Sequence, residues 1–273
     1  MLKVSIAHSP DADDYFLFWP LRKKLIESRN YDFSFAEEDT EVLNSSALRN
    51  EFDICAVSLA VYPQIKDNYL ILPHGASVGR NFGPTIISKR KYSLPELNEK
   101  RVGIPGKNTT SALVFSMIAP GATTIEVPLR PYDTVFKMLE RNEIDAAVVI
   151  HEGQIDYSRH DCELLLDIGK WWHEKYGLPV PLGINVINRR LGKNIDDLSS
   201  LLREAIHYAQ ENVNEIIPEL FTFTQTSQNK LASKDKLENY LSMYANEDSA
   251  EMKADVIKSI EILIGQANVE FSK

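Results

Sequence analysis

The chain has 273 residues, of which 44% are hydrophobic, 25% are charged and only 2 are cysteines. This composition is that of a folded globular protein, and it excludes the collagen-like, disordered and disulfide-stapled classes. The 39 acidic residues outnumber the 30 basic residues, so the net charge is −9. Because such a surface repels phosphate backbones and anionic lipid, we expect neither a nucleic acid nor a membrane as a partner.

The sequence contains no pattern of export or membrane insertion. The first ten residues alternate apolar and polar side chains and lack the apolar run of a secretory signal. The longest apolar runs, such as residues 146–150, are far shorter than the ~20 residues that cross a bilayer. Cys55 and Cys162 are isolated, which is typical of reduced thiols. We therefore expect a cytoplasmic protein.

Short apolar segments alternate with segments of helical periodicity from the start of the chain. The patterns predict strands over 3–7, 31–36 and 53–59 and helices over 14–27 and 41–50. This βαβαβ order is typical of an α/β fold.

The same order returns in the middle of the chain, where a second α/β unit begins near residue 90. The patterns predict strands over 101–104, 124–129 and 145–150 and helices over 110–118 and 132–142. The two halves share this architecture without a repeated sequence.

The last third of the chain changes character. Residues 177–183, GLPVPLG, break any helix, and a further strand is predicted over 184–187 before an almost wholly helical tail. We infer that the tail returns to the first lobe, which then comprises residues 1–90 and 184–273, and that residues 91–183 form an inserted second lobe. Lobes joined by two crossings usually bind a small ligand in the cleft between them.

The glycine-rich segment 75–83, GASVGRNFG, lies between the two predicted lobes. Its composition fits either a flexible crossing between the lobes or a plain loop. The sequence leaves these two interpretations open.

Two apparent ligand motifs lack the residues that their chemistry needs. The segment 103–109, GIPGKNT, resembles a phosphate-binding loop, but Arg101 and Asn108 stand where the motif has Gly and Ser or Thr. His151 and its neighbouring glutamate resemble the start of a zinc motif, but Ile155 replaces the second histidine. We therefore expect no metal site.

The acidic segment 8–14, HSPDADD, joins the first predicted strand to the first helix. Ligands of α/β folds bind at this carboxyl edge of the sheet. Acidic residues also cap a helix and complement its positive end, so capping alone is one interpretation. Three acids in four positions exceed what one cap needs, which makes Asp14 a candidate partner for a substrate hydroxyl.

Three further positions follow predicted strands. Ser58 ends a strand of the first lobe, and Thr109 and Thr110 open a helix whose N-terminal N–H groups would receive a carboxylate or carbonyl. His151 follows the apolar run 145–150, where an imidazole near neutral pH can take a proton from a substrate. The alternatives are a threonine that only caps its helix and a hydrogen-bonded structural histidine.

Six segments occur together in a characteristic order: AHSPDADDYFLFWPL, FDICAVSLAVYPQI, VGRNFGPTIIS, VGIPGKNTTSALVF, IDAAVVIHE and DIGKWWHEKYGLPVPLG. In these segments the chain resembles the 1,4-dihydroxy-6-naphthoate synthase family of the futalosine pathway of menaquinone biosynthesis. The resemblance implies a two-lobed, type 2 periplasmic-binding-protein-like fold. This α/β fold has mixed sheets flanked by helices and a ligand cleft between the lobes.

The resemblance also implies an activity and its residues. Members of the family are cytoplasmic, cofactor-free lyases that convert cyclic dehypoxanthinyl futalosine, a small carboxylate, to 1,4-dihydroxy-6-naphthoate. His151 falls on the general base of the family. The substrate contacts of the family fall on Asp14, Val57, Ser58, Thr109 and Thr110. The chain departs from the family at Ala56, where a lysine is common.

Two other functions remain open from the sequence. A solute-binding protein of an importer would share the two-lobed fold and would need no base. The related chorismate dehydratase of the same pathway carries an acidic GD-type segment where this chain has IHE. Fold analogy alone does not separate the three functions.

Overall fold

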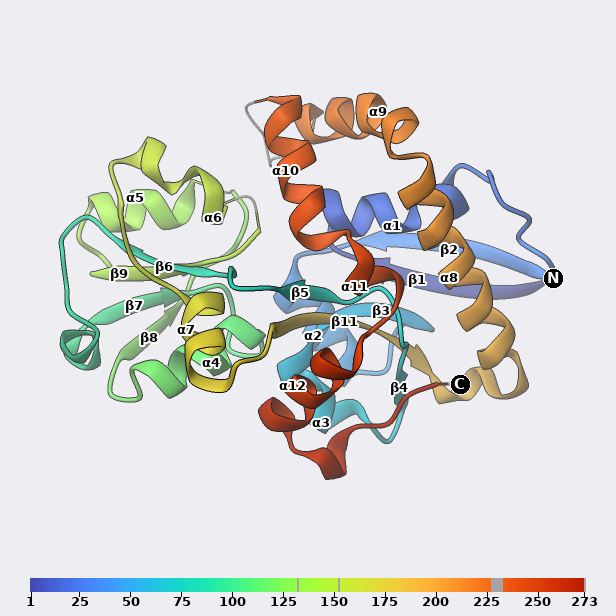
Figure 1. The fold of residues 1–273 in the computed structure, drawn as a ribbon, viewed down its shortest axis with the longest axis horizontal. Coiled ribbons are helices and arrows are strands. Elements are labelled where there is room, and N and C mark those ends of the chain that lie inside the picture. Colours follow the sequence, from blue (N-terminus) through green and yellow to red (C-terminus); the bar gives the residue numbers. More distant parts are fainter. Residues whose placement is uncertain (132, 152, 227–232, 273) are drawn as a thin grey trace. The chain divides into compact units, whose positions relative to one another are not determined.

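A computed structural model describes residues 1–131, 133–151, 153–226 and 233–272. The chain forms two compact units (Figure 1). Unit 1 comprises Met1–Val78 and Pro181–Lys273, and unit 2 comprises Gly79–Val180. Within the described ranges, no helix is both long enough and apolar enough to span a membrane.

The sheet of unit 1 is mixed. Its order is β2-β1-β3-β11-β4, and β5 pairs with β11 off this path. Strand β1 runs parallel to β2 and β3, whereas β11 runs antiparallel to β3 and β4. The strands are β1 (Leu2–His8), β2 (Tyr31–Glu37), β3 (Ile54–Ser58), β4 (Tyr69–Ile71), β5 (Ser77–Gly79) and β11 (Val180–Asn188).

Helices cover both faces of this sheet (Figure 1). The helices of unit 1 are α1 (Ala12–Arg22), α2 (Thr40–Leu48), α3 (Tyr62–Ile65), α8 (Ile195–Glu211), α9 (Val213–Thr226), α10 (Lys234–Tyr244), α11 (Glu247–Ala250) and α12 (Ala254–Ile264). One apolar cluster joins Ile6 of the sheet to α1 and to Leu198 of α8. The other joins Val57 to Leu43 of α2 and Val256 of α12. The C-terminal helices therefore belong to unit 1.

The first helix is shorter than predicted. The pattern over 14–27 continues beyond Arg22, where α1 ends. Lys24 adopts a left-handed φ of 56°, which terminates the helix. Ile26 nevertheless packs against the core from the loop, so its apolar character extends the pattern without extending the helix.

The sheet of unit 2 has the order β10-β6-β9-β7-β8. Its strands are β6 (Thr85–Ser88), β7 (Arg101–Ile104), β8 (Thr123–Glu126), β9 (Ala146–Val149) and β10 (Glu163–Asp167). Its helices are α4 (Thr110–Ile118), α5 (Thr134–Glu140), α6 (Gly153–Asp156) and α7 (Ile168–Tyr176), with α5 and α4 on opposite faces (Figure 1). Tyr132, within the helix predicted over 132–142, lies outside the described residues.

The structure divides the chain earlier than the predicted boundary at residue 90. The division falls between Val78 and Gly79, because β6 pairs with β9 and β10 in the sheet of unit 2. The glycine-rich segment 75–83 contains this point. Its last glycine, Gly83, serves close packing, since a Cβ there would lie 2.9 Å from the backbone nitrogen of Gly169. The interpretation of 75–83 as a plain loop is wrong, because it includes β5.

Candidate functional site

In unit 2, three predicted residues gather at one edge of the sheet. Strands β7 and β9 are parallel neighbours, so their carboxyl ends meet at the same edge. Thr109 and Thr110 begin α4 shortly after β7, and His151 follows β9 by two residues. Helix α4 also contacts β9. The structure therefore brings the N-terminus of α4 and the imidazole to a common edge.

Thr109 is the N-cap of α4. Its hydroxyl accepts a hydrogen bond from the backbone N–H of Ala112 at 3.3 Å and donates one to the carbonyl of Gly106 at 2.7 Å. The Thr109 side chain therefore caps the helix, and a substrate contact at this residue stays a prediction. A ligand at this end would meet the positive end of the helix.

His151 adopts an uncommon backbone conformation. Its φ is 55°, in the left-handed region, and its carbonyl accepts a hydrogen bond from the N–H of Gln154 at 3.2 Å. The side chain is partly exposed, unlike the buried strand that precedes it. Left-handed non-glycine residues store strain and are concentrated at functional sites. Glu152, the next residue, lies outside the described residues.

Unit 1 presents an equivalent edge. Strands β1 and β3 are parallel neighbours, so Asp14 in the first turn of α1 and Ser58 at the end of β3 lie at the same carboxyl edge. Burial raises the pKa of the Cys55 thiol on β3, and the negative charge of Asp14 adds to that shift.

The acids of segment 8–14 have separate roles. Asp13 accepts hydrogen bonds from the hydroxyls of Ser77 and Tyr240, both at 3.3 Å, which ties α1 to β5 and α10. Asp14 accepts one from the backbone N–H of Ser9 at 3.0 Å. Burial raises the pKa of Asp14 to about 6, although the Ser9 bonds act in the opposite direction. A carboxyl with this pKa can accept a hydrogen bond when ionised and donate one when protonated.

Val57 and Ser58 differ in what they offer to a ligand. The Val57 side chain is buried in the apolar cluster under α2, so only its backbone could touch a substrate. The Ser58 hydroxyl and backbone N–H are both bonded to Asn44 of α2. The sequence patterns did not single out Asn44, because its neighbours explain α2 as an ordinary packing helix.

Asn185 is a second residue that the sequence analysis missed. It pairs with Ala56 across β11 and β3, so the two side chains share one face of the sheet. Its Oδ1 is buried and has no hydrogen-bond partner within the described residues. Asn185 thus places an amide beside Ala56.

Two buried histidines of unit 1 are held neutral. Arg22 donates to Nε2 of His8 at 2.8 Å, so that nitrogen must accept and the proton lies on Nδ1, toward the carbonyl of Ser9. Burial, assisted by the charge of Arg22, lowers the pKa of His8 to about 3. Burial likewise lowers the pKa of His74 to about 4.

Because His8 and His74 have lowered pKa values, we predict that the protein loses stability in mild acid. Below the ordinary histidine pKa of about 6.5 the unfolded chain binds two protons that the native protein excludes, so the free energy of unfolding falls by about 1.4 kcal/mol per pH unit for each histidine. Asp14 acts in the opposite sense between about pH 6 and 4, because the native protein retains its proton there.

We expect His74→Gln, which keeps a partner for Ser199, to reduce the pH dependence of the unfolding free energy. Between pH 6 and 4 the decline should become shallower by about 1.4 kcal/mol per pH unit, the contribution of one bound proton. Urea unfolding of variant and parent at several pH values measures this slope. Equal slopes would contradict the burial of a neutral imidazole.

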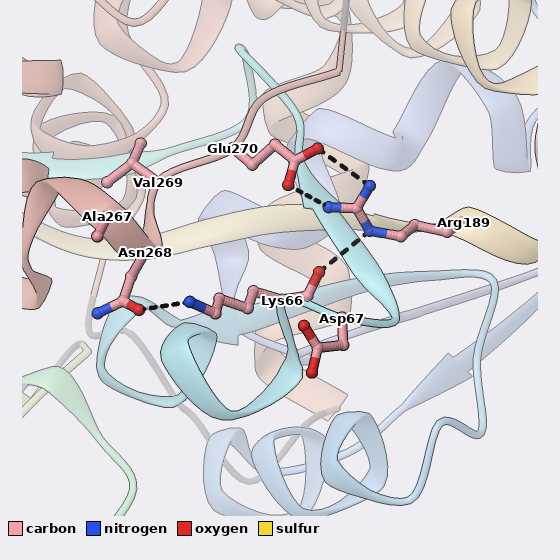
Figure 2. A pocket seen from close by; sticks show the side chains of 7 residues that line it. All are labelled: Lys66, Asp67, Arg189, Ala267, Asn268, Val269 and Glu270. Carbon is pink, nitrogen blue, oxygen red and sulfur yellow. Dashed lines mark hydrogen bonds and ion pairs between the residues drawn. The ribbon is translucent and has the colours of Figure 1, made fainter.

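A cavity of about 590 Å³ in unit 1 is lined by none of the predicted residues (Figure 2). The Arg189 guanidinium lies 2.6 Å from a Glu270 oxygen, and Lys66 donates to Asn268 at 2.8 Å. The basic side chains that line this cavity, Arg189 and Lys66, therefore bind residues of the C-terminal segment. Within the part of the chain that the structure describes, no group of three His, Cys, Asp or Glu side chains could hold a metal ion.

Comparison with solved structures defines the class of fold. A Candida albicans gene product with the generic periplasmic binding protein fold superimposes with a TM-score of 0.68, at 12% identity over 100% of this chain and 92% of that one. Protein AF1704 from Archaeoglobus fulgidus superimposes with a TM-score of 0.87, at 31% identity over 97% of both chains. The fold is therefore that of the periplasmic binding proteins, as predicted.

The family follows from sequence. The family model described as menaquinone biosynthesis matches residues 4–268. The 1,4-dihydroxy-6-naphthoate synthase of Thermus thermophilus is 33% identical over 80% of this chain and 78% of its own. The chain belongs to this menaquinone biosynthesis family of enzymes, which confirms the resemblance seen in its motifs.

Proposed function

We propose that this protein is a cytoplasmic lyase that converts cyclic dehypoxanthinyl futalosine to 1,4-dihydroxy-6-naphthoate. The name of the Thermus thermophilus relative supports the product. Two free, buried cysteines accord with a reducing compartment. The observation that carries the mechanism is the position of His151 at the sheet edge where α4 begins.

The reaction must release the spiro-linked sugar and aromatise the ring, which requires removal of a proton from carbon. A neutral imidazole can accept that proton, and such base catalysis typically contributes about 10²- to 10⁴-fold. We assign this role to His151. The positive N-terminal end of α4, at Thr109 and Thr110, would stabilise the substrate carboxylate or a developing oxyanion.

The residues of unit 1 are assigned to binding. The Asp14 carboxyl, whose pKa is raised to about 6, is suited to a sugar hydroxyl. Ser58 offers a hydroxyl, and the contact at Val57 would come from its backbone. In this assignment no metal and no organic cofactor takes part in proton removal.

The decisive experiment is mass spectrometry of cyclic dehypoxanthinyl futalosine before and after exposure to the purified protein, without added metal or nucleotide. We expect the substrate mass to disappear and that of 1,4-dihydroxy-6-naphthoate to appear. Loss of water from chorismate in a parallel reaction would instead indicate a dehydratase. Binding of either compound without conversion would indicate a solute-binding protein and would overturn the proposal.

A further inference from the structure

Asn44 and Ser58 form a buried pair in unit 1. Asn44 lies on α2 with no exposed surface, and Ser58 ends β3 with 5% of its surface exposed. The backbone N–H of Ser58 donates to Oδ1 of Asn44 at 2.8 Å, and Nδ2 of Asn44 donates to Oγ of Ser58 at 3.1 Å. One amide thus engages both polar groups of the serine.

The direction of both bonds follows from chemistry. A backbone N–H can only donate, so the Asn44 atom that faces it must be the oxygen. The nitrogen must then face the Ser58 hydroxyl, and the same nitrogen lies 3.5 Å from a carboxylate oxygen of Glu41, which can only accept. If the amide were flipped, its NH₂ group would face the Ser58 N–H, and two donors cannot form a hydrogen bond.

This arrangement determines what Ser58 can do. Its backbone N–H is occupied, and its Oγ already accepts a hydrogen bond, so the hydroxyl hydrogen must point elsewhere. Over residues 1–131, 133–151, 153–226 and 233–272, no acceptor receives that hydrogen. The hydrogen of this buried hydroxyl is therefore available to an acceptor atom of a ligand.

We propose that Asn44 is a positioning residue that directs the Ser58 hydroxyl hydrogen toward the substrate, so that the substrate group at Ser58 is an acceptor, a carboxylate or carbonyl oxygen. This inference rests on the proposed function in taking Ser58 as a substrate contact. It adds the polarity of that contact and the residue that sets it.

Asn44→Asp tests the proposal with almost no change of shape. One carboxylate oxygen of the aspartate still accepts from the Ser58 N–H, while the other now accepts from the hydroxyl and turns its hydrogen away from the substrate. We expect KM for cyclic dehypoxanthinyl futalosine to rise about tenfold, with kcat changed much less. Thermal melting of each variant monitors folding.

A double-mutant cycle separates this effect from simple charge repulsion. Ser58→Ala alone should raise KM by a similar factor, and the double variant should be no worse than either single variant, because both changes remove the same donor. Losses that multiply in the double variant would overturn the inference, since the new charge would then act independently of Ser58.

A crystal structure of the His151→Asn variant with the substrate tests the same claim without altering Asn44. We expect Ser58 Oγ within hydrogen-bond distance of a carboxylate or carbonyl oxygen. A substrate hydroxyl that donates to Oγ, or no substrate atom near it, would overturn the inference while conversion by the parent chain still supported the proposed function. Failure of the parent chain to convert the substrate would overturn both.

Discussion

His151→Asn is expected to lower kcat for the conversion by about 10²- to 10⁴-fold while substrate binding stays nearly unchanged. An asparagine amide cannot accept the substrate proton, so the chemical step loses its base. Asparagine also tolerates the left-handed conformation that residue 151 adopts at φ 55°, so the turn after β9 should be retained. Single-turnover kinetics measure the chemical step, and titration of the substrate into the slow variant measures binding.

His173→Asn is the matched control for this change. His173 lies exposed on α7 in the same unit, so the identical substitution there should leave kcat unchanged. If His151→Asn retains near-parental kcat, the assignment of the base is wrong. If it abolishes binding as well, His151 acts in substrate binding and not in proton removal.

The elements that position the candidate site were predictable because each has a local cause. The apolar runs became β3, β7 and β9, whose carboxyl ends lie next to Ser58, Thr109 and His151. The N-cap geometry of Thr109 follows from the preference of threonine for that position. Strands β6 and β10 were not predicted, since their short segments show no pattern that distinguishes them from loops.

The polar contacts that refine the site were not predictable from spacing or periodicity. The pairing of Asn44 with Ser58, and of Asp13 with Tyr240, depends on how separate elements pack. The pairing of Asn185 with Ala56 depends on the register of β11 against β3. Val57 is the opposite case. It was expected to contact the substrate together with Ser58, but its side chain faces the apolar core.

Gly169→Ala is expected to destabilise the protein by about 3 kcal/mol or more, the upper end of what overpacking usually costs. A Cβ at this position of α7 would lie 1.9 Å from the carbonyl oxygen of Phe82 and 2.1 Å from its carbon. Both are backbone atoms of the segment that leads into β6, so no side-chain rotation can relieve the overlap. The helix or the segment must shift, and β6 pairs with both β9 and β10.

Gly177→Ala, at the other end of α7, is the matched control. Gly177 has a left-handed φ of 68°, but a Cβ there would have no atom within 4 Å. The control therefore carries only the conformational strain of a left-handed alanine, about 1 kcal/mol. Thermal and urea unfolding should show that the Gly169→Ala variant is much less stable than the Gly177→Ala variant. Equal losses would show that Phe82 and its neighbours yield easily, and that close packing is not what requires glycine at 169.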